Sequence, residues 1–344
     1  MEPVRIGFVG AGFMGQLAHL VNYDRLAEAR VVALAEPRTE LRARVARRYE
    51  IPETYEDHRA LLADADVDAI VAPQPYHRHA ALVPELLSAG RPLFTEKPIA
   101  VRPATGRQLA DRADELDVAH MIGYHKRCDP AMERARTVIE GWRSTGAVGA
   151  MRFVRVTMPP GDWIAHAPSP IETDETPPTG AVEPPPEPFE GPAAELYDHV
   201  INYYVHQLNA IRYLTGEDYD VRYGTDRLLA VETDGGVEAV IELAPYETEH
   251  DWQESILVGF DRANVRIKLP PPLARQRSGT VTIERVADGE QTVRRPALGA
   301  EWAMFRQARR FVAVARGERQ APCGPREAAA DLEAAAAYVR KATD

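Results

Sequence analysis

The stretch RIGFVGAGFMG, residues 5–15, decides the fold of the first third of the chain. It begins as a short apolar run typical of a buried strand and ends in GAGFMG, which fits the pattern GxGxxG. The first glycine permits a tight turn, the second lets the backbone approach a pyrophosphate, and the third lets the following helix pack on the strand. The stretch therefore predicts a dinucleotide-binding strand and helix, with helix amides facing the phosphates. The cofactor-binding residues expected here are Gly10, Gly12, Phe13, Met14 and Gly15.

A carboxylate follows at the spacing that this fingerprint requires. Glu36 ends the second predicted strand, 21 residues after Gly15, and such a residue accepts hydrogen bonds from the adenosine ribose of a dinucleotide. Its charge repels a 2′-phosphate, so the sequence favours NAD over NADP. Arg38 comes two residues later and keeps NADP possible.

Strand-like and helix-like patterns alternate from this stretch as far as residue 123. Short β-branched runs are followed by helical patterns of about ten residues, which predicts right-handed βαβ units and a parallel, doubly wound sheet. We therefore expect a Rossmann domain over residues 1–123. The expected strands are 5–10, 30–35, 67–72, 92–95 and 119–123, and the expected helices are 13–26, 40–49, 58–63, 79–89 and 105–116.

The regular alternation of strand-like and helix-like patterns ends after residue 123, and we expect a second, α+β domain over residues 124–344. Its strands are separated by turn residues, which is typical of an antiparallel arrangement. The expected strands are 150–157, 227–231, 236–244, 254–260 and 264–268, and the expected helices are 130–141, 196–214, 300–316 and 325–343.

Residues 158–192 form a proline-rich segment inside the second predicted domain. It carries 11 prolines in 35 residues and shows neither a helical nor a strand period. A segment of this length is either a functional lid or a disordered insertion. Proline makes it stiff and extended, and we expect a lid over the substrate domain.

Composition excludes several classes of protein. With 45% hydrophobic residues, 41 Lys and Arg against 52 Asp and Glu, and a net charge of −11, the chain is globular and acidic. Nucleic acid and membrane are therefore not expected partners. Cys128 and Cys323 lie far apart without metal-ligand spacing, and we expect neither a disulfide nor a metal. The start of the chain has no secretory pattern, so the expected location is the cytoplasm.

A lysine stands at the end of another strand of the predicted parallel sheet. Lys97, in the triplet EKP of residues 96–98, would emerge at the carboxyl edge, where open α/β sheets bind ligands. His77 and His79 precede it as an HxH pair, but no third ligand accompanies them, so a metal is not expected.

Five segments together resemble the glucose-fructose oxidoreductase, inositol dehydrogenase and MocA (Gfo/Idh/MocA) family. The resemblance covers most of the chain in the same order, and it implies NAD(P)-dependent oxidation or reduction of sugars and cyclitols. It also implies a C-terminal domain built on an open, mostly antiparallel sheet, and we expect a homodimer or homotetramer. The segments are GAGFMG, residues 10–15; PYHRH, 75–79; EKP, 96–98; GYHKRCDP, 123–130; and HQLNAIRYLTG, 206–216.

The resemblance implies a catalytic pair, formed by the lysine of EKP and a histidine on a helix of the second domain. These match Lys97 and His206. The segments of the first domain match residues that lie around the cofactor in the family. On that basis the further expected cofactor contacts are Pro75, His79, Glu96 and Lys97.

The histidine-bearing helix departs from the family pattern DxGxHxxD. Asn202 and Asn209 stand where that pattern has carboxylates, which puts the family's aspartate contacts in doubt here. With His206 they fall at i, i+4 and i+7 on one helical face, so all three could line one cleft. The expected substrate contacts are Asn202, Asn209, Tyr124, His125, Lys126 and Arg127.

These residues suffice for hydride transfer between nicotinamide and a secondary alcohol. His206 would act as the general base, and Lys97 would stabilise negative charge on the substrate oxygen. If burial depressed its pKa, Lys97 could accept the proton instead. Two alternatives stay open: a glycosidase that oxidises its substrate transiently and retains NAD, and a non-catalytic sugar sensor that binds NAD(P).

Overall fold

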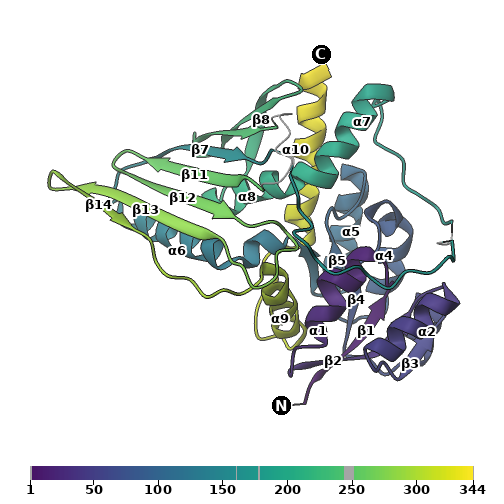
Figure 1. Ribbon diagram of the computed structural model, residues 1–344. Helices are drawn as coiled ribbons and strands as arrows, with labels where there is room; N and C mark the ends of the chain where they lie inside the picture. Colours follow the sequence, from purple (N-terminus) through teal and green to yellow (C-terminus); the bar gives the residue numbers. More distant parts are fainter. Residues whose placement is uncertain (1, 160, 177–178, 244–251, 344) are drawn as a thin grey trace. The chain divides into compact units, whose positions relative to one another are not determined.

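Six parallel strands form the sheet that the N-terminal sequence predicts (Figure 1). The computed structural model describes residues 2–159, 161–176, 179–243 and 252–343. The strand order β3-β2-β1-β4-β5-β6 is that of a Rossmann fold, and it reverses between β1 and β4. The predicted Rossmann architecture is confirmed. The strands are β1 (Val4–Val9), β2 (Ala29–Ala35), β3 (Glu53–Tyr55), β4 (Ala69–Ala72), β5 (Leu93–Glu96) and β6 (His120–Gly123).

Helices follow the strands of this sheet as the alternation predicts. The first begins with a π-type segment, Gly15–Leu20, which continues into a short α-helical turn. Local sequence explains two helix starts: Asp57 accepts a hydrogen bond from the Ala60 amide, and Pro103 opens the fifth helix. The α-helices are α1 (Val21–Tyr23), α2 (Thr39–Arg48), α3 (His58–Asp64), α4 (His79–Leu87) and α5 (Pro103–Glu115).

The second sheet has eight strands in the order β14-β13-β12-β11-β7-β10-β9-β8. Among the described strands of this second sheet, only β7 and β10 pair in parallel, and the other pairs are antiparallel. The expected open, mostly antiparallel sheet is therefore confirmed. Its strands are β7 (Met151–Thr157), β8 (Tyr219–Gly224), β9 (Leu228–Thr233), β10 (Glu238–Glu242), β11 (Glu254–Phe260), β12 (Ala263–Leu269), β13 (Thr280–Ala287) and β14 (Glu290–Arg294).

The single helix expected over residues 196–214 consists of three segments. A π-type segment, Val200–Tyr204, separates two α-helices, and Gly216 ends the second in a left-handed conformation with φ of 69°. A π-type segment changes the angular spacing of side chains, so the period assumed from the sequence does not hold across it. The α-helices of this half are α6 (Pro130–Thr145), α7 (Gly191–His199), α8 (Val205–Thr215), α9 (Ala303–Ala315) and α10 (Pro325–Thr343).

The chain divides into two compact units, which do not follow a single boundary in the sequence. The first unit contains Met1–Tyr124, Pro168–Pro188 and Met304–Leu332; the second contains His125–Ala167, Phe189–Ala303 and Glu333–Asp344. The sequence analysis placed 168–188 and 304–332 in the second domain. Their contacts explain the difference: Phe311 of α9 packs edge-on against Phe94 of β5, with ring centroids 5.7 Å apart.

The proline-rich segment is the clearest departure from the expected division. Its central part, Pro168–Pro188, which we call the strap, bonds to residues of the Rossmann unit at several points. Residues 177 and 178 of the strap, and residue 160 of the longer segment, lie outside the described residues. The strap is thus a docked part of the first unit, not an insertion in the second.

The structure also bears on two expectations from composition, which concern the cysteines and the membrane. Cys128 and Cys323 are both buried thiols. Among the described residues, no helix has the length and apolar character needed to cross a membrane.

Candidate functional site

The glycine loop after β1 adopts the conformation that its sequence predicts. Gly10 has φ of 97°, and a Cβ built on it would lie 1.8 Å from Nε2 of Gln74. That amide nitrogen donates to the carbonyl oxygen of Val9 at 2.9 Å, so it is fixed in place. A Cβ on Gly15 would lie 2.6 Å from the carbonyl oxygen of Gly10. Both positions therefore require glycine, one for its backbone angle and both for close packing.

Gly12 differs from its two neighbours in having open space beside it. A Cβ built on Gly12 would meet no heavy atom within 4 Å in the described part of the chain. The flanking Phe13 is 40% exposed although it is large and apolar, and Met14 is half-buried. Open space above a glycine at the start of a helix is what a pyrophosphate requires, so the loop fits a dinucleotide.

This difference predicts the behaviour of a Gly12→Ala variant. The added methyl group enters open space, so we expect its unfolding midpoint in urea to match that of the wild type. We also expect its affinity for NAD⁺ to fall about tenfold or more, since the backbone can no longer approach the phosphates closely. Isothermal titration measures this, with Gly299→Ala, another glycine beside open space, as the control. Unchanged NAD⁺ affinity in Gly12→Ala would contradict the assignment of the loop.

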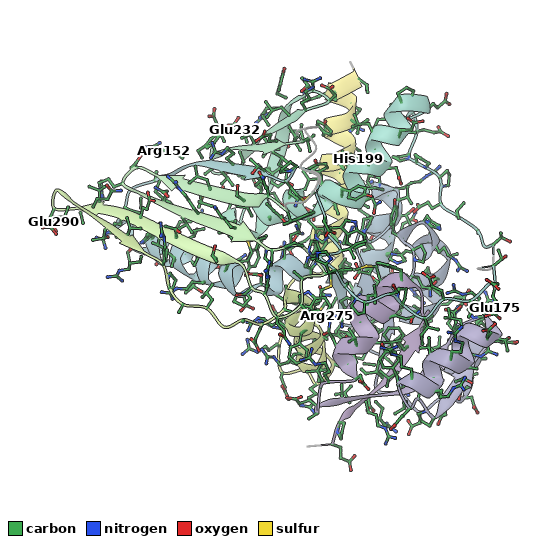
Figure 2. All side chains as sticks on the ribbon, viewed as in Figure 1. Arg152, Glu175, His199, Glu232, Arg275 and Glu290 are labelled. Atoms are coloured by element: carbon green, nitrogen blue, oxygen red, sulfur yellow. The ribbon has the colours of Figure 1, made fainter. Side chains whose placement is uncertain are left out.

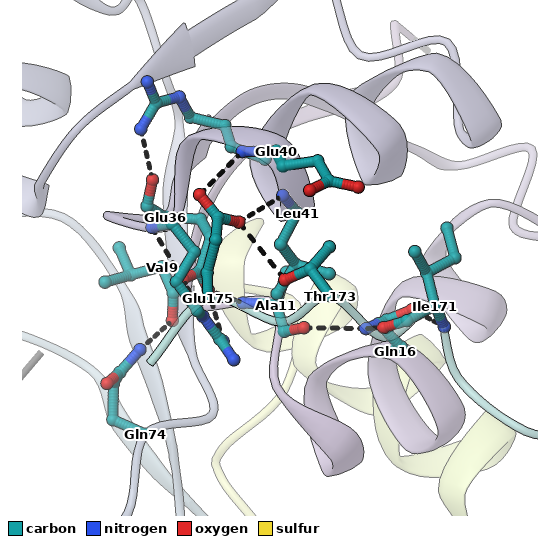
Figure 3. A network of polar contacts seen from close by, with 12 residues as sticks. Val9, Ala11, Gln16, Glu36, Glu40, Leu41, Gln74, Ile171, Thr173 and Glu175 are labelled. Atoms are coloured by element: carbon teal, nitrogen blue, oxygen red, sulfur yellow. Dashed lines mark hydrogen bonds and ion pairs between the residues drawn. The ribbon is translucent and has the colours of Figure 1, made fainter. Parts of the chain in front are cut away.

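Glu36 lies at the end of β2, beside the glycine loop, and is only 2% exposed. Its carboxylate accepts a hydrogen bond from the Ala11 amide at 2.8 Å (Figure 3). It also accepts from Nε and Nη2 of Arg38, at 2.7 and 3.0 Å. The structure thus brings the predicted ribose acid and the predicted loop together. Arg38, the residue that left NADP binding possible in the sequence analysis, donates its hydrogen bonds to this same carboxylate.

Lys97 follows β5 at the carboxyl edge of the sheet, as expected, and is half-buried. Its neighbour Glu96 accepts a hydrogen bond from the Lys97 amide at 3.2 Å, and the second carboxylate oxygen lies 2.7 Å from Nε2 of His19. Burial alone would raise the pKa of Glu96, but the His19 hydrogen bond and the Lys97 charge outweigh it and hold that pKa below its ordinary value. His19 is a residue that the sequence analysis missed, because only the fold carries it to the EKP triplet.

His79 is fully buried, and Pro75 lies on an exposed turn. The ring nitrogens of His79 lie 3.1 Å from the carbonyl oxygens of Ile99 and Gln74. Burial lowers the pKa of His79, so the neutral ring donates to one of these carbonyls. His79 therefore holds the segments after β4 and β5 together, which argues against the direct cofactor contact expected from the sequence.

In the second unit, His206 lies in the first turn of α8 and is 9% exposed. The ring of His125 packs edge-on against it, with centroids 4.8 Å apart. Asn202 lies one turn earlier, in the half-buried part of the π-type segment. Lys97 belongs to the first unit, where Tyr124 is also buried, so the pairing of Lys97 with His206 stays a prediction.

Three expected substrate contacts are instead tied to partners in the interior of the second unit. Nε of Arg127 donates to Oδ1 of Asn209 at 2.5 Å, and both residues are buried. Lys126 is buried in an ion pair with Glu254, the first residue of β11. The sequence analysis missed Glu254 because it lies 128 residues further along the chain and belongs to no motif.

The Lys126–Glu254 pair is part of a small buried network. Nε2 of Gln207 donates to the other carboxylate oxygen of Glu254 at 2.7 Å. The ammonium group of Lys126 lies 5.6 Å from the ring centre of Trp252. Burial lowers the pKa of Lys126, against the opposing effect of the Glu254 charge. The pocket lined by Lys126 and Glu254 has about 10 Å³, room for about one water, so this pocket is too small for a sugar.

A protein-family model matches the N-terminal part of the first unit. Residues 4–124 match the model GFO_IDH_MocA, an oxidoreductase family with an NAD-binding Rossmann fold. A levoglucosan dehydrogenase from Pseudarthrobacter phenanthrenivorans is 30% identical over 181 residues, which cover 50% of this chain and 44% of that protein. An inositol 2-dehydrogenase from Rhizobium meliloti is 31% identical over 169 residues, 48% of this chain and 49% of that protein. The matches thus span about half the length of these relatives.

Solved structures match over nearly the whole chain at low identity. A putative NADPH-dependent oxidoreductase from Desulfitobacterium hafniense has a TM-score of 0.79 at 16% identity, covering 100% of this chain and 96% of that one. A levoglucosan dehydrogenase in complex with NADH and levoglucosan has a TM-score of 0.74 at 17% identity, covering 99% and 98%. These likenesses support the fold of both units.

Proposed function

Since the Rossmann domain of this chain belongs to the NAD-binding Gfo/Idh/MocA oxidoreductase family, we propose that the protein is an NAD(P)-dependent dehydrogenase of a sugar or cyclitol. The observation that carries the proposal is the open space at Gly12 beside the buried carboxylate of Glu36. The substrate class is supported by relatives that include levoglucosan and inositol dehydrogenases.

The residues that would hold the cofactor come from the carboxyl edge of the parallel sheet. The glycine loop offers helix amides to the pyrophosphate, and Glu36 offers a carboxylate to the adenosine ribose. The EKP segment after β5 lies at the same edge. Nicotinamide, when bound, supplies the hydride acceptor or donor.

In this proposal, His206 transfers the proton and Lys97 stabilises the negative charge on the substrate oxygen. The imidazole of His206 takes the proton of the substrate hydroxyl, because an imidazole titrates near neutral pH and suits a general base. The ammonium group of Lys97 donates a hydrogen bond to the same oxygen and stabilises its developing negative charge. His125 packs on the His206 ring and restricts its orientation.

A panel of sugars, cyclitols and glycosides offered with NAD⁺ tests the proposal. A dehydrogenase releases reduced cofactor, so we expect absorbance at the NADH band to rise in proportion to the substrate consumed over many turnovers. NADP⁺ and a reaction without protein are the controls. Release of an aglycone from a glycoside without accumulation of NADH would instead indicate the redox-assisted glycosidase. Ligand binding without any turnover across the panel would indicate a sensor.

A further inference from the structure

The strap lies along the edge of the parallel sheet at which the strands end. It bonds to the segment after β1 through Ile171, and to the segment after β2 through Glu175. Glu183 bonds to the segments after β4 and β5, through the carbonyl oxygen of His77 and the amide of Val101. Ligands of open α/β sheets bind at this edge, so the strap and the cofactor site share it.

One anchor of the strap lies directly beside the glycine loop. Gln16, the residue after Gly15, is buried and receives a hydrogen bond at Oε1 from the Ile171 amide at 2.8 Å (Figure 3). Its Nε2 donates to the carbonyl oxygens of Ile171 at 3.0 Å and of Ala11 at 2.8 Å. The same amide side chain thus holds both the strap and the loop that carries Gly12.

A second anchor places a carboxylate on the first turn of α2. Arg38, the N-cap residue, makes no side-chain capping bond to the described first turn, which leaves helix amides unsatisfied. Glu175, labelled in Figure 2, accepts hydrogen bonds from the amides of Glu40 and Leu41, each at 2.9 Å, and from the Thr173 hydroxyl at 3.2 Å (Figure 3). The hydrogen bond from the Glu40 amide is the largest cause of the lowered pKa of Glu175, so this side chain is a carboxylate at neutral pH.

The position of this carboxylate bears on the choice of cofactor. The ribose acid Glu36 lies two residues before Arg38, the N-cap of α2. Two groups near it suit a 2′-phosphate: the guanidinium of Arg38, and the amides at the positive end of the α2 dipole. Glu36 binds the first and Glu175 binds the second. Both of these groups therefore already have a carboxylate partner.

We propose that Glu175 is a specificity-determining residue, which excludes the 2′-phosphate of NADP from the cofactor site and leaves the site selective for NAD. This inference rests on the cofactor binding of the proposed function. Glu175 acts from the strap, 160 residues after Gly15, the last glycine of the fingerprint. It adds a second negative charge to that of Glu36, and it removes the helix amides as a site for an anion.

Nucleotide affinities measured by isothermal titration with NAD⁺ and NADP⁺ test the inference. The quantity of interest is the ratio of the two dissociation constants for each protein. We expect NAD⁺ to bind the wild type at least about tenfold more tightly than NADP⁺. Glu175→Ala opens both amides, and Glu175→Gln removes the charge while keeping one acceptor. We expect Glu175→Ala to shift the ratio toward NADP⁺ by about tenfold or more, and Glu175→Gln to shift it in the same direction by less.

The control is Glu172→Gln, which removes the same charge from an exposed side chain of the strap and should leave the ratio at the wild-type value. A loosened strap changes both affinities together, so the ratio separates loosening from selectivity. An unchanged ratio in Glu175→Ala, or a wild type that binds both nucleotides equally, would overturn the inference and leave the cofactor assignment intact. A wild type that binds neither nucleotide would overturn the proposed function and this inference with it.

Discussion

The Lys97→Ala and His206→Ala variants are expected to turn over at least about a hundredfold more slowly than the wild type, the usual loss for a charge-stabilising or proton-transferring group. Lys97 lies at the carboxyl edge of the Rossmann sheet, and His206 opens α8 in contact with His125. Removing either side chain removes one half of the proposed pair. Initial rates of NADH formation with a substrate from the panel give the comparison.

Two controls separate chemistry from binding. NAD⁺ affinity of His206→Ala, measured by titration, should stay close to the wild-type value, because His206 lies on α8 of the second unit and the residues proposed to hold the cofactor belong to the first. Lys268→Ala, at an exposed lysine on β12, should leave the rate unchanged. Normal turnover by His206→Ala would exclude it as the base.

The Lys126→Met variant is expected to lose about 3 to 5 kcal/mol of unfolding free energy, the usual cost of leaving one charge of a buried ion pair alone. The side chain of Glu254 is 1% exposed, so its carboxylate would remain buried, with the Gln207 amide as its remaining donor among the described contacts. A folded chain with an unpaired buried carboxylate must either expose that charge to water or protonate it, and both changes cost free energy. Urea denaturation followed by circular dichroism measures the change.

Matched variants show whether the loss of unfolding free energy arises because the Lys126–Glu254 pair is buried. Arg152→Met breaks an exposed pair with Asp261, and should cost only about 0 to 1 kcal/mol. The double variant Lys126→Met/Glu254→Leu removes both charges, so it should recover much of the stability lost in Lys126→Met. A single variant as stable as the wild type would contradict the assignment of this pair as a structural element.

Helices and strands could be predicted from the sequence where they depend on patterns of neighbouring residues. The strands of the Rossmann sheet and the helices between them were predicted from apolar runs and helical periods. Among the described strands of this sheet, only the three-residue β3 was not predicted. In the second unit β8, β13 and β14 were missed, because their outer residues are exposed and their pattern is weak. The π-type segment before α8 was also missed, since its side chains still look helical in sequence.

Partners distant in the chain account for the remaining differences. Lys126 was expected from the sequence to contact the substrate, but its partner Glu254 is set by the pairing of β11 with β7. His79 was identified from the family segment, and only its burial between two loops revealed a positioning role. His19 lies in the helical segment after β1, and only the fold brings it to Glu96 at the end of β5.

The sequence by itself determined the glycine loop, the carboxylate of Glu36 beside it and the alternation of strand and helix over residues 4–123. Each depends on residues within about 20 positions of one another, where spacing and backbone preference are readable directly. Only the tertiary structure decided where the proline-rich segment lies. Its composition predicts an extended chain and says nothing of what that chain touches. Glu175 acquired its place at α2 because the helix lacked a capping side chain of its own and the fold brought a carboxylate to its unsatisfied amides.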